Sequence, residues 1–162
     1  MSDAPDPKRD LLRHTLATLA YRAGKTLRGA PGRFPVFRVG DGTRTPAQIL
    51  AHVGDLLDSA HWIANGEHRW HASEPLPWDL EVDRFFTALA RLDARLAAPE
   101  PLGFPPEKLF QGPIADALTH VGQLAMLRRL AGSPVRGENY FRAEIEVGRV
   151  GPEHATPVRE FD

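Results

Sequence analysis

The sequence contains no cysteine, which excludes disulfide bonds, thiolate metal sites and a cysteine nucleophile. It also lacks a large net charge of either sign, because 20 Lys and Arg residues against 21 Asp and Glu residues leave a formal charge of −1. Binding to a nucleic-acid backbone or an anionic membrane needs a basic surface, so neither partner is expected. No apolar run approaches the roughly 20 residues that span a bilayer. The first ten residues lack the apolar segment of a signal peptide, and we expect a cytoplasmic protein.

Proline is absent from four long windows, and these windows predict four helices. Proline interrupts a helix because it has no N–H and its ring clashes with the preceding turn. The windows cover residues 8–30, 47–74, 78–98 and 114–133. Apolar residues recur at helical spacing within them, as Leu12, Leu16 and Leu19 do in the first. The expected fold class is therefore all-α, with the architecture of a four-helix bundle.

Two of these windows carry clear boundary signals. Thr45 and Gln48 flank Pro46 in the pattern of a capping box with proline at the first helical position. The last helix is expected to begin at Pro113 and to end at Gly132, since glycine commonly terminates a helix.

The remaining segments predict irregular connections and a C-terminal extended tail. Residues 33–44 and 100–111 are expected to be loops. Residues 141–147 alternate apolar and polar side chains, which predicts a short strand that packs on the helices, with residues 35–39 as its expected partner. The segment after Gly151 is polar and contains proline, so we expect a loosely held end. We assign residues 1–135 to the bundle domain and 136–162 to the tail.

Polar residues on the inner helix faces mark a candidate site. His52 lies within the apolar stripe of the second helix, and Asp116, His120 and Gln123 share one side of the fourth. Asp116 and His120 are four residues apart, so their side chains lie on adjacent turns within reach of one ion. With His52 from a facing helix they would offer two imidazoles and a carboxylate, a set that suits Zn²⁺, Ni²⁺ or Fe²⁺.

Each candidate residue also has a structural interpretation. His52 could be a core histidine bonded to a neighbour, and Asp116 could be a first-turn carboxylate that complements the helix dipole. We expect helix packing, rather than a pocket, to explain the three tryptophans. No metal role is predicted for the other histidines, which are His14, His61, His68, His71 and His154.

Two segments resemble the DinB-like superfamily, which includes the YfiT-type metalloproteins. Residues 45–56 (TPAQILAHVGDL) are similar to its second helix. Residues 120–135 (HVGQLAMLRRLAGSPV) are similar to its last-helix motif, His-Arg-Gly-Gln-Leu followed by Leu-Arg and Gly-x-Pro. In that family one histidine of the second helix and two of the last, in an HxxxH arrangement, bind a divalent metal. His52 and His120 match two of these positions, and Asp116 occupies the third.

The resemblance implies a bacterial, cytoplasmic homodimer that binds a divalent metal. Its activity would be that of a metal-dependent hydrolase or of a transferase that uses a low-molecular-weight thiol, so a small-molecule substrate or thiol is the expected partner. Gln123 would orient a ligand or contact the substrate. The alternative function is non-catalytic: a metal-binding or dimerising helical module that serves structure or a stress response.

Overall fold

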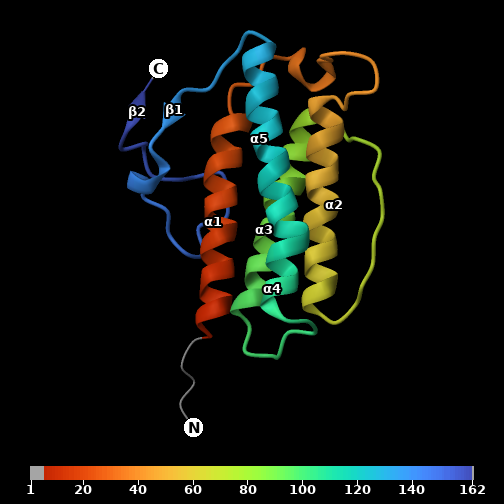
Figure 1. Cartoon of the computed structure of the whole chain (residues 1–162), viewed down its shortest axis with the longest axis vertical. Helices are drawn as coiled ribbons and strands as arrows, with labels where there is room; N and C mark the ends of the chain where they lie inside the picture. The colour runs from red at the N-terminus through yellow and green to blue at the C-terminus, as the bar shows by residue number, and fades with distance from the viewer. Residues whose placement is uncertain (1–5, 162) are drawn as a thin grey trace.

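The computed structural model describes residues 6–161, in which four long helices lie side by side (Figure 1). They are α1 (Pro7–Leu27), α2 (Pro46–Ala64), α3 (Trp78–Ala97) and α5 (Ala115–Leu130). α1 and α2 each contact both α3 and α5, so the four helices enclose one core. The chain is an all-α protein, as the sequence predicted. Residues 1–5, on which the signal-peptide prediction falls in part, and residue 162 lie outside the described residues.

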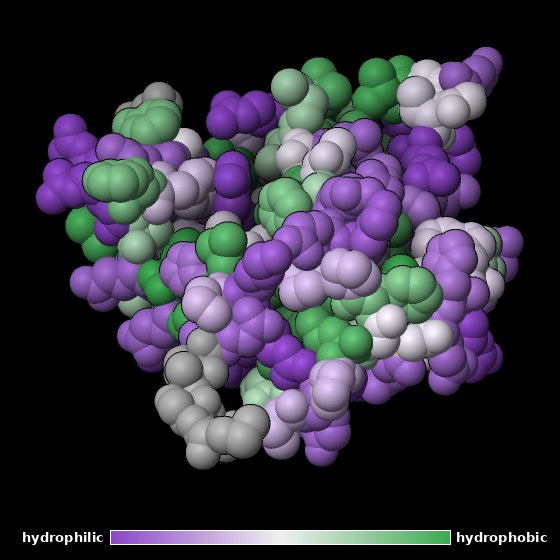
Figure 2. Space-filling model, turned by 60° about the horizontal axis from the view of Figure 1, so that its bottom comes forward, coloured by the Kyte–Doolittle hydropathy of each residue, from purple (hydrophilic) through white to green (hydrophobic). Residues whose placement is uncertain are grey.

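The buried faces of these helices follow the apolar spacing in the sequence. The stripe predicted for α1 is confirmed, since Leu12, Leu16 and Leu19 are all buried. Within residues 6–161, no helix has both the length and the apolar character needed to cross a membrane. Figure 2 shows the molecule turned so that the bottom of Figure 1 comes forward. On this side, hydrophilic side chains separate small patches of hydrophobic residues.

The start of α2 is confirmed, but its end differs from the prediction. Thr45 Oγ1 accepts from the Gln48 N–H at 3.3 Å, and Gln48 Oε1 accepts from the Thr45 N–H at 2.9 Å. The helix ends at Ala64 instead of continuing towards residue 74, because Gly66 adopts a left-handed conformation with φ of 87°. Residues 65–77 then form a long loop that returns to α3 and passes beside α2 (Figure 1).

The connection before α5 is more helical than expected. Residues 100–111 were expected to form a loop, yet α4 (Pro106–Leu109) and the π-helical turn η2 (Phe110–Ile114) occupy much of it. Gly112 has non-helical angles (φ −92°, ψ −105°), and Pro113 follows it. This kink lies within η2, and α5 begins after it at Ala115 rather than at Pro113.

The strand predicted for residues 141–147 is wrong, and so is its pairing with residues 35–39. The chain forms short 3₁₀ turns there instead, η3 (Tyr140–Arg142) and η1 (Phe34–Val36). Alternation favoured a strand, but a strand needs a hydrogen-bonded neighbour, and Phe141 is 96% exposed. The described strands are β1 (Gly137–Glu138) and β2 (Glu160–Phe161), which pair antiparallel.

A buried ionic cluster joins the two C-terminal strands to α1. The Glu138 side chain is 0% exposed, accepts from the Tyr21 hydroxyl at 2.6 Å and lies 2.9 Å from Lys25 Nζ. Lys25 Nζ also lies 2.7 Å from a carboxylate oxygen of Glu160 in β2. Burial and the adjacent Glu138 carboxylate raise the pKa of Tyr21 far above its ordinary value, so its hydroxyl stays protonated and donates. These contacts connect β1 and β2 to α1.

Candidate metal centre

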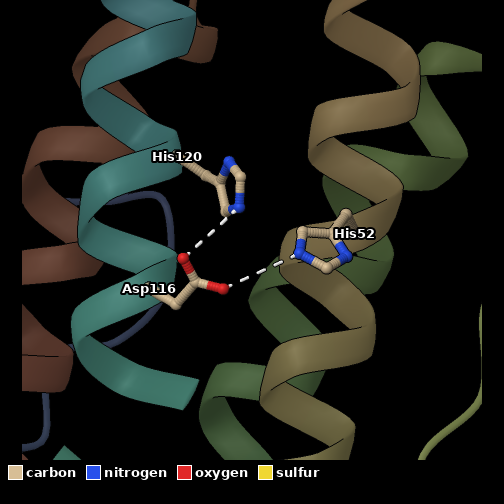
Figure 3. Close-up of side chains that lie close together, drawn as sticks. All are labelled: His52, Asp116 and His120. Atoms are coloured by element: carbon tan, nitrogen blue, oxygen red, sulfur yellow. Dashed lines mark ion pairs between the residues drawn. The ribbon is translucent and has the colours of Figure 1, made fainter. Parts of the chain in front are cut away.

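The structure brings the three predicted ligands together between two helices. His52 projects from α2, and Asp116 and His120 project from α5 towards it (Figure 3). Asp116 lies between the two imidazoles: its Oδ2 is 3.8 Å from His52 Nε2 and its Oδ1 is 3.5 Å from His120 Nε2. One ligand atom from each residue lies within 4.8 Å of the other two. The grouping follows from the i, i+4 spacing on α5 and the contact between α2 and α5.

These separations match ligands around a shared ion better than they match hydrogen bonds. Zinc bonds to nitrogen and oxygen are about 2.1 Å long, so two ligands of a tetrahedral ion lie about 3.4 Å apart. The two Nε2–carboxylate distances, 3.5 Å and 3.8 Å, lie close to that value. A good N–H···O bond is shorter, about 2.9 Å.

Gln123 fixes the orientation of the His120 ring. Its Oε1 lies 2.7 Å from His120 Nδ1. An amide oxygen only accepts, so Nδ1 donates to it, and in a ring that carries one hydrogen the lone pair of Nε2 is directed towards Asp116. A lone pair and a carboxylate oxygen then face each other across 3.5 Å, and a cation between them removes the repulsion. Gln123 therefore has the orienting geometry that the sequence suggested.

The surroundings of His52 favour its neutral form. Its side chain is 20% exposed, and its ring packs edge-on against His120 and Trp70 with centroid separations of 4.7 Å and 5.5 Å. Burial lowers the pKa of His52 below its ordinary value, and the positive charges of Arg44 and of His120, when protonated, lower it further. Neutral imidazole is the form that binds a metal, so this environment suits a ligand.

The structural interpretations of His52 and Asp116 find less support. Within residues 6–161, His52 makes no hydrogen bond to a core neighbour, and its ion-pair contact is with Asp116. Asp116 does lie in the first turn of α5. However, the Ala115 N–H at that end donates to carbonyl oxygens of η2, so the preceding turn already satisfies part of the helix start.

A second group of carboxylates and a histidine was missed by the sequence interpretation. Asp55, Asp58 and His71 also place ligand atoms within 4.8 Å of one another. Arg84 occupies this group, with Nη2 at 2.5 Å from Asp55 Oδ1 and 3.0 Å from Asp58 Oδ2. Asp55 also accepts from the Ser73 N–H at 2.8 Å, which fixes the 65–77 loop to α2. The available signal was Asp55 itself, a carboxylate on the buried side of a helix.

The other histidines and the tryptophans take structural positions. In the described part of the chain, His14, His61, His68 and His154 belong to no group of three potential metal ligands, whereas His71 belongs to the group with Asp55 and Asp58. Trp62 stacks edge-on with His71, and Trp78 does so with Phe34. Trp70 differs from the expectation of helix packing, because it contacts His52 from the 65–77 loop and lines a pocket.

Comparison with known proteins does not place the chain in a family. No family model matches it, and neither a curated protein nor a solved structure does so. The similarity to the DinB-like superfamily therefore rests on residues 45–56 and 120–135 alone.

Proposed function

We propose that this chain is a metal-binding protein of the DinB-like type, in which His52, Asp116 and His120 hold one divalent cation. The observation that supports the proposal is the convergence of three ligand atoms from α2 and α5 within 4.8 Å of one another. Two imidazoles and one carboxylate suit Zn²⁺, Ni²⁺ or Fe²⁺ and leave coordination positions for an exogenous group.

The residues divide the work of such a site between them. His52 offers a neutral imidazole because burial and the charge of Arg44 disfavour its protonation. Gln123 keeps the His120 lone pair directed at the centre, and Asp116 supplies the negative charge that offsets part of the cation. A divalent ion held there would lower the pKa of a coordinated water or thiol towards neutrality.

We propose a hydrolase or an S-transferase that uses a low-molecular-weight thiol, on the basis of the sequence resemblance. Asp116 is one wall residue of a pocket, so a small molecule in that pocket would lie beside the ligands. The resemblance also leads us to propose a homodimer in the bacterial cytoplasm. Turnover in a screen of ester, amide and thiol-transfer substrates separates the enzyme from a non-catalytic metal-binding module.

Calorimetric titration of the metal-free chain with Zn²⁺ and Ni²⁺ tests the site. We expect one ion per chain near neutral pH and weaker binding at pH 5, because protons compete for the imidazoles. His52→Ala and His120→Ala should each abolish this binding, since two remaining ligands hold a divalent ion poorly. His61→Ala is the matched control, because His61 lies on α2 outside the cluster. Unchanged binding in both cluster variants would refute the proposal.

A further inference from the structure

A pocket of about 830 Å³ lies beside the candidate metal centre. Leu56 and Ile63 of α2 form part of one wall, and residues of α4, η2 and α5 form the other. The 65–77 loop contributes Trp70, and Asp116 belongs both to this pocket and to the metal cluster. Small-molecule sites in proteins typically have volumes of about 300–1,000 Å³, so this space can hold a ligand of that size.

The lining is apolar except for a few residues, and its formal charges are those of Asp116 and Lys108. Asp116 faces the two histidines. Lys108 is different: within residues 6–161 its ammonium group makes no ion pair or hydrogen bond with the protein. The neighbouring carboxylate of Glu107 does not neutralise it, because Glu107 pairs with Lys8. The pocket therefore combines a largely apolar lining with two separate charges: the Asp116 carboxylate beside the histidines, and the Lys108 ammonium, which no described carboxylate contacts.

We infer that this pocket binds a small carboxylic acid whose apolar or aromatic body lies against Trp70 and Leu56 and whose carboxylate pairs with Lys108. A single ammonium and no arginine line the pocket, which matches one monovalent anion better than a phosphate dianion. The inference rests on the proposed function in one respect: a cation on Asp116 removes the negative charge that would repel the ligand. Zinc and the carboxylate should therefore each strengthen the binding of the other.

The test measures binding of 4-phenylbutyrate and of its uncharged analogue 4-phenylbutanamide to the full chain, with and without Zn²⁺, by calorimetry. We expect the carboxylate to bind about fivefold more tightly than the amide, which is the upper range for one solvent-accessible ion pair. Lys108→Met should remove this preference and Lys108→Arg should keep it. Arg129→Met is the control, since it removes an exposed cation of α5 that lies outside the pocket lining. Thr119→Trp, which adds bulk to the pocket wall, should weaken binding of both probes.

Equal affinity for acid and amide, a preference that survives Lys108→Met, or no binding of either probe at millimolar concentration would each overturn the inference. The arm without Zn²⁺ separates this inference from the proposed function. A Lys108-dependent preference in a chain that binds no zinc would refute the metal site and retain the pocket. A carboxylate that binds only through zinc would leave Lys108→Met without effect, which refutes the pocket and retains the metal site.

Discussion

Two groups of carboxylates and histidines lie about one turn apart along α2, and they differ in whether the protein supplies a cation. Asp55 and Asp58 share the guanidinium of Arg84, at 2.5 Å and 3.0 Å. Within residues 6–161, the ion-pair contacts of Asp116 are those with His120 and His52, at 3.5 Å and 3.8 Å. Both groups place three potential ligands within 4.8 Å, so proximity does not distinguish them.

The difference follows from the cost of burying a charge. Asp55 has a side chain that is 2% exposed, and a carboxylate so deep is stable only when it is paired and hydrogen-bonded. Arg84 and Ser73 meet that need, so this group fixes the 65–77 loop to α2 and α3. Asp116 is 48% exposed, so water solvates its carboxylate and burial imposes no need for an internal cation. A cation from solution can therefore complete the group of His52, Asp116 and His120, whereas Arg84 already occupies the group of Asp55 and Asp58.

The largest expected effect comes from removing the internal cation. Arg84→Met leaves Asp55 without its guanidinium partner, and Glu81, whose side chain is 0% exposed, loses an ion pair at 3.1 Å. Removing one partner of a buried pair costs about 3–5 kcal/mol. Urea unfolding at neutral pH measures the loss, and Arg91→Met is the control because its exposed pair with Asp58 should contribute no more than about 1 kcal/mol. If the two variants lost equal stability, Arg84 would not act as a buried cation that the group of Asp55 and Asp58 needs.

The next largest effect is the stabilisation that zinc should give through His52, Asp116 and His120. At a zinc concentration 100-fold above the dissociation constant, binding stabilises the folded chain by about 2.7 kcal/mol. Asp116→Ala should reduce that gain, and Asp116→His, which restores the arrangement of the resembled family, should retain or increase it. Melting temperatures with and without Zn²⁺ measure the gain. If both variants keep the wild-type gain, Asp116 is a first-turn carboxylate and the third ligand must be another residue.

The sequence predicted the candidate site because its signals are local. Asp116 and His120 are one turn apart on a single helix, and His52 stands out as a polar residue in an apolar stripe. The packing of α2 against α5 then brings the three side chains together. The second group could not be found in this way. His71 comes from a loop that was expected to be helical, and Arg84 comes from a third helix, so their meeting with Asp55 depends on tertiary packing.

The same distinction between local and tertiary signals explains the errors in the fold. Proline and glycine positions gave four helices, because both residues act on the backbone where they stand. The alternating pattern of residues 141–147 failed as a strand signal because a strand also requires a neighbour, and none of the described segments pairs with it. The tail instead contacts α1 through Glu138. The burial of this residue could not be predicted from a repeating pattern of apolar residues.

Glu138 is a further buried carboxylate that pairs with a cation of the protein, Lys25. Removing it should lower the stability of the fold by less than the loss of Arg84 does. Glu138→Ala deprives the Tyr21 hydroxyl of its acceptor and removes one of the two carboxylates beside Lys25. Hydrogen bonds to charged groups are worth about 2 kcal/mol, so a loss of that size is expected in urea unfolding. Phe141→Ala is the control, because a side chain that is 96% exposed should change stability by less than about 0.5 kcal/mol. If Phe141→Ala lowered the stability more than Glu138→Ala does, the apolar residues of the tail, rather than Glu138, would be its main contact with the helices.

The smallest expected effect is on acid sensitivity, and it tests whether Arg84 holds Asp55 ionised. Burial alone would raise the pKa of Asp55, but the hydrogen bonds from Arg84 and Ser73 outweigh it and lower the pKa below its ordinary value. The unfolded chain then binds this proton more tightly than the folded one. The stabilisation is therefore complete above the unfolded pKa, about 3.9, and is lost as the pH falls through the lower folded value.

Urea unfolding from pH 7 to pH 2.5 measures this dependence in wild type and in Asp55→Asn. The variant cannot take up the proton, so its stability should fall less steeply below about pH 4, although it starts from a lower value at pH 7. Asp41→Asn, in an exposed loop, should follow the wild-type slope. If the stability of Asp55→Asn depends on pH as that of wild type does, then the contacts with Arg84 only offset the cost of burying the ionised Asp55. The contrast between a carboxylate group with its own cation and one that can accept a cation would then rest on geometry alone.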